Sequence, residues 1–97
     1  MAKQIDRLIH EPARLQVVSQ LFVIEAADFL FLIRQTGLTF GNLSSHLSKL
    51  ENAGYVEIKK DFIGKKPHTM VSLTQKGRRA FNAYMKAMKN VFEGLPQ

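Results

Sequence analysis

Residues 39–50 contain the strongest indication of the fold, in the segment Thr39-Phe40-Gly41-Asn42-Leu43-Ser44-Ser45-His46-Leu47-Ser48-Lys49-Leu50. At helical spacing its leucines share one side, whereas Gly41 and the serines gather on the opposite side. The leucine side is suited to packing on a core. The other side is smooth and rich in hydroxyl groups, with no acidic residue before Glu51, so it could lie close against an anionic partner.

The residues before this segment predict a shorter helix and a tight turn. Asp28 is placed to cap a helix that ends near Gln35, and Gly37 fits the left-handed residue that closes it. Thr39 then caps the central helix, over residues 39–52. Two helices joined by a short turn with glycine form a helix-turn-helix, whose second helix enters the DNA major groove.

The positive charge of the chain is concentrated after residue 38. The 97 residues carry a formal net charge of +6, yet bases and acids cancel in residues 1–38. Residues 39–79 carry eight bases against three acids. A basic surface of this kind is typical of proteins that bind a polyanion, and it favours nucleic acid as the partner.

Chain length and residue types exclude several further classes of protein. A chain of 97 residues suits one domain, residues 1–97, with a single core. There is no cysteine, so neither a disulfide framework nor a thiolate metal site can form. No apolar run approaches the roughly 18–20 residues of a membrane span, and the N-terminus lacks a signal-peptide pattern. We expect a cytoplasmic protein with no membrane partner.

Further helices and a hairpin flank the helix-turn-helix. A first long helix opens at Pro12 and carries an apolar stripe. Alternating residues predict strands over 55–60 and 69–73, and the basic segment 61–68 between them is predicted to form the hairpin tip. The sequence therefore predicts a mostly helical α+β fold with its core in residues 10–77.

The last helix, over residues 76–93, carries an apolar stripe longer than so small a core needs. Its members are Phe81, Tyr84, Met85, Met88, Val91 and Phe92. Exposed apolar surface of this length usually marks an oligomer interface. We expect a two-fold homodimer through this helix, with Ile5 to Ile9 as a further contact. The alternative is that the helix packs back on its own core.

The order helix, helix-turn-helix, basic hairpin, helix resembles the winged helix-turn-helix of prokaryotic transcription regulators. The segments 37–39, 42–51 and 53–56 are similar to motifs of the ArsR and MarR families, above all to the small single-domain MarR-like regulators, which are often archaeal. Leu73-Thr74 with Gly77-Arg78 also resembles their entry into the last helix. The resemblance covers about residues 9–84 and implies a homodimeric DNA-binding transcriptional regulator.

The resemblance also implies which residues meet DNA. On the central helix, in the major groove, these are Thr39, Gly41, Asn42, Ser44, Ser45 and Lys49. On the wing, residues 60–68, beside the backbone or in the minor groove, they are Lys65, Lys66 and His68. Ser45 stands where many members carry a basic or amide side chain, which leaves Asn42 as the candidate for bidentate adenine recognition.

Other functions find less support in the residues. His10, His46 and His68 lie on separate predicted elements without cysteine, so no metal site is expected. No nucleophile motif or glycine-rich phosphate loop predicts an enzyme or a cofactor. A small-molecule effector stays open, with no residue pointing to its identity. The alternative function is a winged-helix protein-interaction module in a larger complex. RNA binding is less favoured because an aromatic stacking platform is lacking.

Overall fold

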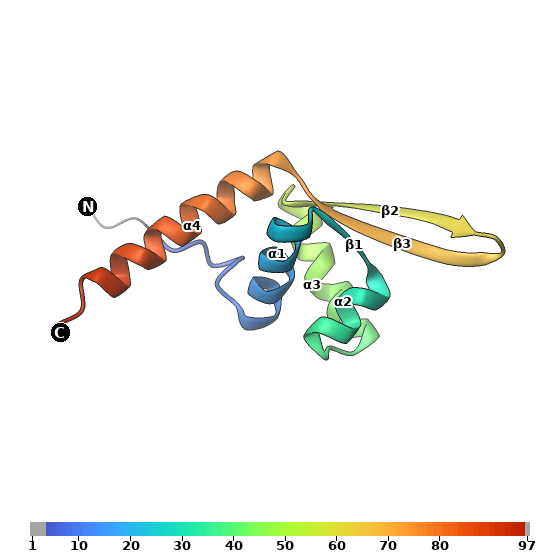
Figure 1. Cartoon of the computed structure of the whole chain (residues 1–97), viewed down its shortest axis with the longest axis horizontal. Coiled ribbons are helices and arrows are strands. Elements are labelled where there is room, and N and C mark those ends of the chain that lie inside the picture. Colours follow the sequence, from blue (N-terminus) through green and yellow to red (C-terminus); the bar gives the residue numbers. More distant parts are fainter. Residues whose placement is uncertain (1–3, 97) are drawn as a thin grey trace.

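The computed structural model of the protein describes residues 4–96, which form four helices and one three-stranded antiparallel sheet (Figure 1). The sheet order is β1-β3-β2. The elements are α1 (Pro12–Ile24), β1 (Ala26–Asp28), α2 (Phe29–Thr36), α3 (Phe40–Asn52), β2 (Val56–Ile63), β3 (Lys66–Leu73) and α4 (Gln75–Glu93). The β2–β3 hairpin and α4 extend from opposite ends of the helical body. This arrangement confirms the predicted α+β winged helix.

The predicted helix-turn-helix is present in α2 and α3, and its caps explain the helix boundaries. The Asp28 carboxylate accepts a hydrogen bond from the N–H of Phe31 at 2.7 Å and starts α2. Gly37, with φ of 69°, ends α2 in the left-handed conformation that glycine adopts without strain. The Thr39 hydroxyl then accepts from the N–H of Asn42 at 3.2 Å and starts α3.

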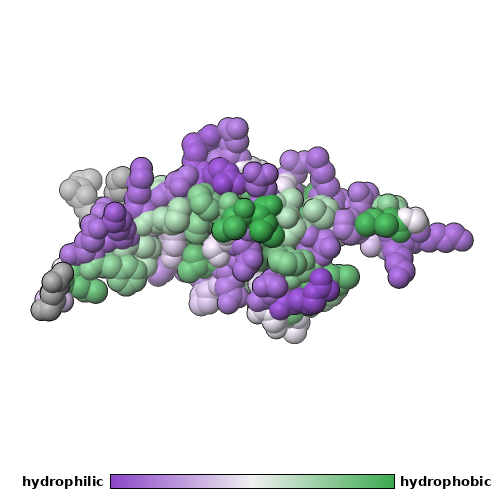
Figure 2. Space-filling view, in the orientation of Figure 1, coloured by the Kyte–Doolittle hydropathy of each residue, from purple (hydrophilic) through white to green (hydrophobic). Residues whose placement is uncertain are grey.

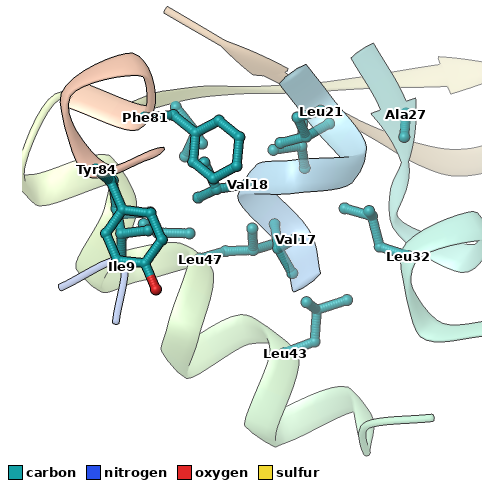
Figure 3. Packing of buried hydrophobic residues seen from close by; sticks show 13 residues of the cluster. Ile9, Val17, Val18, Leu21, Ala27, Leu32, Leu43, Leu47, Phe81 and Tyr84 are labelled. Carbon is teal, nitrogen blue, oxygen red and sulfur yellow. The ribbon is translucent and has the colours of Figure 1, made fainter. Parts of the chain in front are cut away.

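The core forms around α1, between the leucine side of α3 and the first turns of α4 (Figure 3). Leu43, Leu47 and Leu50 are almost completely buried, and burial of each such side chain stabilises the fold by about 1.5–3 kcal/mol. The orientation of α3 is therefore fixed by its leucines. The buried cluster comprises Ile9, Val17, Val18, Leu21, Ala27, Leu32, Leu43, Leu47, Leu50, Val56, Val71, Phe81 and Tyr84.

The wing is longer than predicted, and the assignment of residues 61–68 to a loop is wrong. Strands β2 and β3 pair in register out to Ile63 opposite Lys66, so only Gly64 and Lys65 form the turn. Gly64 has a φ of 63°, which suits the first central residue of a two-residue hairpin turn. Backbone ladder bonds extend the hairpin beyond the buried residues, where side-chain alternation gives no hydrophobic signal.

Strand β1 was not predicted from the sequence. Its three residues pair with β3, with Ala27 opposite Val71. The chain turns into β1 at Glu25, whose φ of 71° and ψ of −46° are uncommon for a residue with a side chain. Both backbone polar groups of Glu25 are hydrogen-bonded. Its N–H donates to the carbonyl of Leu21, and its carbonyl accepts from the N–H of Leu73 at 3.1 Å.

Replacing Glu25 with glycine is expected to raise the free energy of unfolding by about 1 kcal/mol. A residue held at such a φ stores roughly 1–3 kcal/mol of strain, part of which is offset by the greater freedom of glycine in the unfolded chain. Urea denaturation measures the difference. Glu25→Ala is the control, because it keeps the strain while removing the same exposed side chain. Equal stability of the two variants would contradict the assignment of strain.

The N-terminal segment is fixed to the body by polar contacts. The Tyr55 hydroxyl donates to the Asp6 carboxylate at 2.5 Å, and the same carboxylate accepts from the N–H groups of Leu8 and Ile9. Burial, together with the Asp6 charge and hydrogen bond, raises the pKa of Tyr55 to about 12, so its hydroxyl stays a donor at physiological pH.

Every helix of residues 4–96 is too short or too polar to cross a membrane.

Candidate nucleic-acid interface

Helix α3 presents one long face to solvent. With its leucines buried, the side chains of Asn42, Ser44, Ser45 and Lys49 are exposed, as predicted from their helical spacing. The backbone at Gly41 is equally accessible, since outside its chain neighbours and the adjoining helix backbone no atom of the described residues lies within 4 Å of the position a Cβ would take.

His46, at the edge of the buried side, ties α3 to the start of α1. Its Nδ1 lies 2.9 Å from the Arg14 guanidinium and 3.3 Å from the Glu11 carboxylate. Burial raises the pKa of Glu11, but hydrogen bonds from the N–H groups of Ala13 and Arg14 and the neighbouring positive charges outweigh it and leave the pKa below its usual value. The charged Glu11 therefore anchors a cluster that resists rotation of α3.

The exposed face of α3 has two halves. Phe40, Ser44, Ser48 and Glu51 line a groove of about 710 Å³ that separates α3 from the hairpin. Ser45 lies about 100° around the helix from Ser44 and belongs to the outer half. Helical spacing predicts equivalent positions for the two serines, whereas Ser44 lies toward the wing and Ser45 away from it.

The groove joins three elements. Its α2 side carries Phe29, whose ring centroid lies 4.4 Å from that of Phe40. Its hairpin side carries Ile58, Lys60 and Pro67. Lys60 was missed in the sequence analysis, although it continues the alternation of Val56 and Ile58 and therefore belongs on the groove face of β2. Phe40, which sequence reasoning left out of the site, is 63% exposed at the mouth of this groove.

The wing carries exposed lysines along its length. Lys65 lies at the turn and Lys66 opens β3, so both project beyond the helical body. His68 lies within β3 and not in a loop, and its Nδ1 is 3.2 Å from the Asp61 carboxylate across the ladder. Part of the hydrogen-bonding capacity of His68 is thus directed within the wing.

The start of α3 offers further polar groups. The first N–H groups of a helix have no acceptor within the helix, and the local dipole favours an anion there. The exposed Thr39 hydroxyl accepts from Asn42 and keeps its own proton available for donation.

The expected dimer helix is only partly exposed. Phe81 and Tyr84 are 6% and 5% exposed, and both pack in the core of their own subunit. Tyr84 also hydrogen-bonds His10 at 2.8 Å, while its burial raises its pKa. Met88 is half-buried, whereas Met85, Val91 and Phe92 are exposed. The first part of the apolar stripe, at Phe81 and Tyr84, therefore packs on the core of its own subunit, as the alternative to a dimer interface expects.

The three histidines are engaged in separate contacts, to Tyr84, to the Glu11–Arg14 pair and to Asp61. Across residues 4–96, no three His, Cys, Asp or Glu side chains come together as a metal site.

An exposed second helix in a helix-turn-helix, followed by a basic β-hairpin and a long last helix, defines the winged-helix class of proteins. Residues 13–92 match the family described as winged helix DNA-binding domain, and the chain belongs to this family.

Known proteins support this assignment. An uncharacterised protein of Methanocaldococcus jannaschii is 37% identical over 79 residues, which cover 81% of this chain and 86% of that protein. The structure of a transcriptional regulator homologue from Pyrococcus horikoshii OT3 has a TM-score of 0.87 and 30% identity, over 95% of this chain and 91% of that one.

Two regulator families share the fold at lower identity. A MarR family protein from Porphyromonas gingivalis W83 has a TM-score of 0.68 and 21% identity over 92% of this chain and 86% of that one. An ArsR family transcriptional regulator has a TM-score of 0.59 and 16% identity over 93% and 88%. The resemblance drawn from the sequence is confirmed.

Proposed function

We propose that the protein is a DNA-binding transcriptional regulator that acts as a homodimer, with α3 in the major groove and the wing beside the backbone or in the minor groove. The observation that carries the proposal is the exposed face of α3, which has no acidic residue over residues 39–50, next to a hairpin with exposed lysines. Hydroxyl and amide side chains can approach base edges and phosphates there without charge repulsion.

Each residue of α3 has a role set by its position. Thr39 and the first N–H groups of the helix bind a phosphate, and Gly41 allows close approach of the backbone. Asn42 is the candidate for adenine, since an amide can donate to N7 and accept from N6 at once. Ser44 and Ser45 donate to phosphates or base edges, while Lys49 neutralises a phosphate.

The lysines of the wing supply affinity that carries no sequence information. Replacing both Lys65 and Lys66 with alanine is expected to weaken duplex binding and to reduce the slope of log K against log salt by about 1.8, because each lost phosphate contact removes about 0.9. Fluorescence anisotropy of a labelled duplex at several salt concentrations measures the slope.

The matched control is the double change of Lys86 and Lys89 to alanine. Both lysines are exposed on α4, so the net charge changes equally, away from α3 and the wing. We expect its salt slope to stay close to that of the unmodified protein. Equal slopes for the two double variants would remove the wing from the proposed mechanism.

The proposed dimer uses the outer part of α4. Val91 and Phe92 are 49% and 63% exposed, where α4 extends beyond the helical body (Figure 1). Figure 2 shows apolar surface along this extension. Apolar side chains concentrated on one face favour association with a second copy. Of the N-terminal residues expected to contribute, Ile9 is buried in its own subunit, and Ile5 and Leu8 pack against the same core.

Replacing Val91 and Phe92 together with aspartate is expected to produce a monomer in sedimentation equilibrium, because a charge cannot be buried unpaired in an apolar interface. Asn90→Asp is the control, since this exposed position lies on the polar side of the same helix turn. A monomeric unmodified protein without affinity for duplex DNA would favour the protein-interaction module over the regulator.

A further inference from the structure

The far end of the wing is apolar, and this feature has no role in the fold. Phe62 and Ile63 are 70% and 64% exposed, and neither belongs to the buried cluster or packs against it. Figure 2 shows an apolar patch near the end of the wing, surrounded by hydrophilic side chains. Exposed apolar surface rimmed by polar side chains is a feature of interaction sites.

Strand alternation places Phe62 and Ile63 on opposite faces of the hairpin. Ile58 and Lys60 line the groove beside α3, and Phe62 is the next residue on the same face of β2. Its cross-strand neighbour Pro67 also lines the groove. Phe62 therefore lies at the outer end of the surface that α3 and the wing share, whereas Ile63 points to the reverse side of the hairpin.

The charges around Phe62 indicate the chemistry of the partner. Lys60, Lys65 and Lys66 are all exposed within a few residues of it, against the single acid Asp61, which is engaged by His68. An apolar side chain on a hairpin with exposed cations fits a polyanion that also offers apolar surface. Duplex DNA offers such surface where a base step is partly unstacked, between two phosphate backbones.

We propose that Phe62 is a wedge that enters the minor groove, partly unstacks one base step and bends the duplex. This inference rests on the proposed function, in which α3 occupies the neighbouring major groove. Pro67 is the cross-strand partner of Phe62, and its ring fixes the backbone φ on the adjacent strand. Lys65 and Lys66 hold the flanking phosphates, so the wing grips and deforms DNA at the same place.

The wedge gives the protein a sequence preference without hydrogen bonds to bases. Pyrimidine–purine steps such as TA unstack and kink most easily, so a duplex with such a step beneath the wing costs less to deform. Loss of the wedge removes this preference and leaves readout by α3 unchanged.

The test compares Phe62→Thr with the unmodified protein. Threonine is also a strand former, so the hairpin is retained, which circular dichroism verifies. The probe is a duplex of about 30 base pairs, selected by the unmodified protein from a random pool and carrying fluorophores at its ends. We expect the unmodified protein to shorten the end-to-end distance, and Phe62→Thr to bind roughly tenfold more weakly without bending the duplex. Val23→Thr, at a position on α1 that is 78% exposed, is expected to bend DNA normally.

A second measurement replaces the pyrimidine–purine step of the selected duplex. We expect this change to weaken binding of the unmodified protein and to have no effect on Phe62→Thr. Equal bending by Phe62→Thr and the unmodified protein would overturn the wedge while leaving the regulator in place. Failure of the unmodified protein to select any duplex would overturn both. If Phe62→Thr instead lost sedimentation with phosphatidylglycerol vesicles and kept its bending, the apolar tip would be a membrane contact and the wedge would be wrong.

Discussion

Gly77→Ala is expected to lower the free energy of unfolding by about 3 kcal/mol or more, because overpacking against backbone cannot be relieved by a rotamer change. A Cβ at Gly77 would lie 2.2 Å from the Tyr55 carbonyl oxygen and 2.8 Å from a methyl group of Leu73. The first turn of α4 cannot move away from these atoms. Thr74 caps it, donating its hydroxyl to the carbonyl of Gly54 at 2.6 Å and accepting from the N–H of Gly77 at 3.0 Å.

The same substitution at Gly41 is the control. Within the described chain, no atom outside the chain neighbours and the adjoining helix backbone lies within 4 Å of a Cβ at this position in α3. Alanine is the better helix former, so Gly41→Ala is expected to leave stability unchanged or to raise it by up to about 1 kcal/mol. Urea denaturation compares the two variants. A Gly77→Ala protein as stable as Gly41→Ala would show that α4 does not approach Tyr55 as described.

Ser45→Glu is expected to weaken duplex binding by about 100-fold. Ser45 lies on the outer half of the exposed face of α3, and a carboxylate there would meet the phosphates of the major groove. Such like-charge contacts cost several kcal/mol, and about 2.7 kcal/mol corresponds to 100-fold. The fold should be retained, because the side chain is exposed and glutamate is a good helix former. Fluorescence anisotropy gives the affinity, and thermal unfolding monitors the fold.

Asn82→Glu is the control, which separates the effect of a charge at residue 45 from the effect of a lower net charge. Asn82 is exposed on α4, so this variant has the same net charge as Ser45→Glu but alters a different surface. Its affinity is expected to fall only slightly, through the general loss of positive charge. Comparable losses in the two variants would mean that α3 has no special place in DNA binding.

The fold was predictable where the signals are local. Asp28, Gly37 and Thr39 act through hydrogen bonds and backbone angles within a few residues, and all three cap helices as the sequence indicated. Strand β1 depends instead on β3, whose residues lie more than 40 positions later, and on the unusual backbone of Glu25. The outer half of the wing is held by ladder bonds between exposed residues, so no hydrophobic pattern marks it.

The exposed face of α3 could be predicted from the sequence, but the groove beside it could not. Helical spacing placed Ser44 and Ser45 on the exposed side of α3, and both are exposed. The groove, which Ser44 lines and Ser45 does not, arises from the approach of Phe40 to Phe29 and from the hairpin, which are tertiary contacts. Tyr84 is buried in its own subunit beside His10, and this contact between residues 74 positions apart has no local pattern that could predict it.

We propose that the outer face of α3 lies against DNA, and cross-linking from a single position measures this contact. The chain has no cysteine, so Ser45→Cys carries a photoreactive group at one defined position, and Asn82→Cys carries the same group on α4. On irradiation with bound duplex, the group at residue 45 is expected to cross-link to bases, and the group at residue 82 is expected to leave the DNA unmodified. Cross-linking from residue 82 but not from residue 45, with the duplex still bound, would contradict the claim.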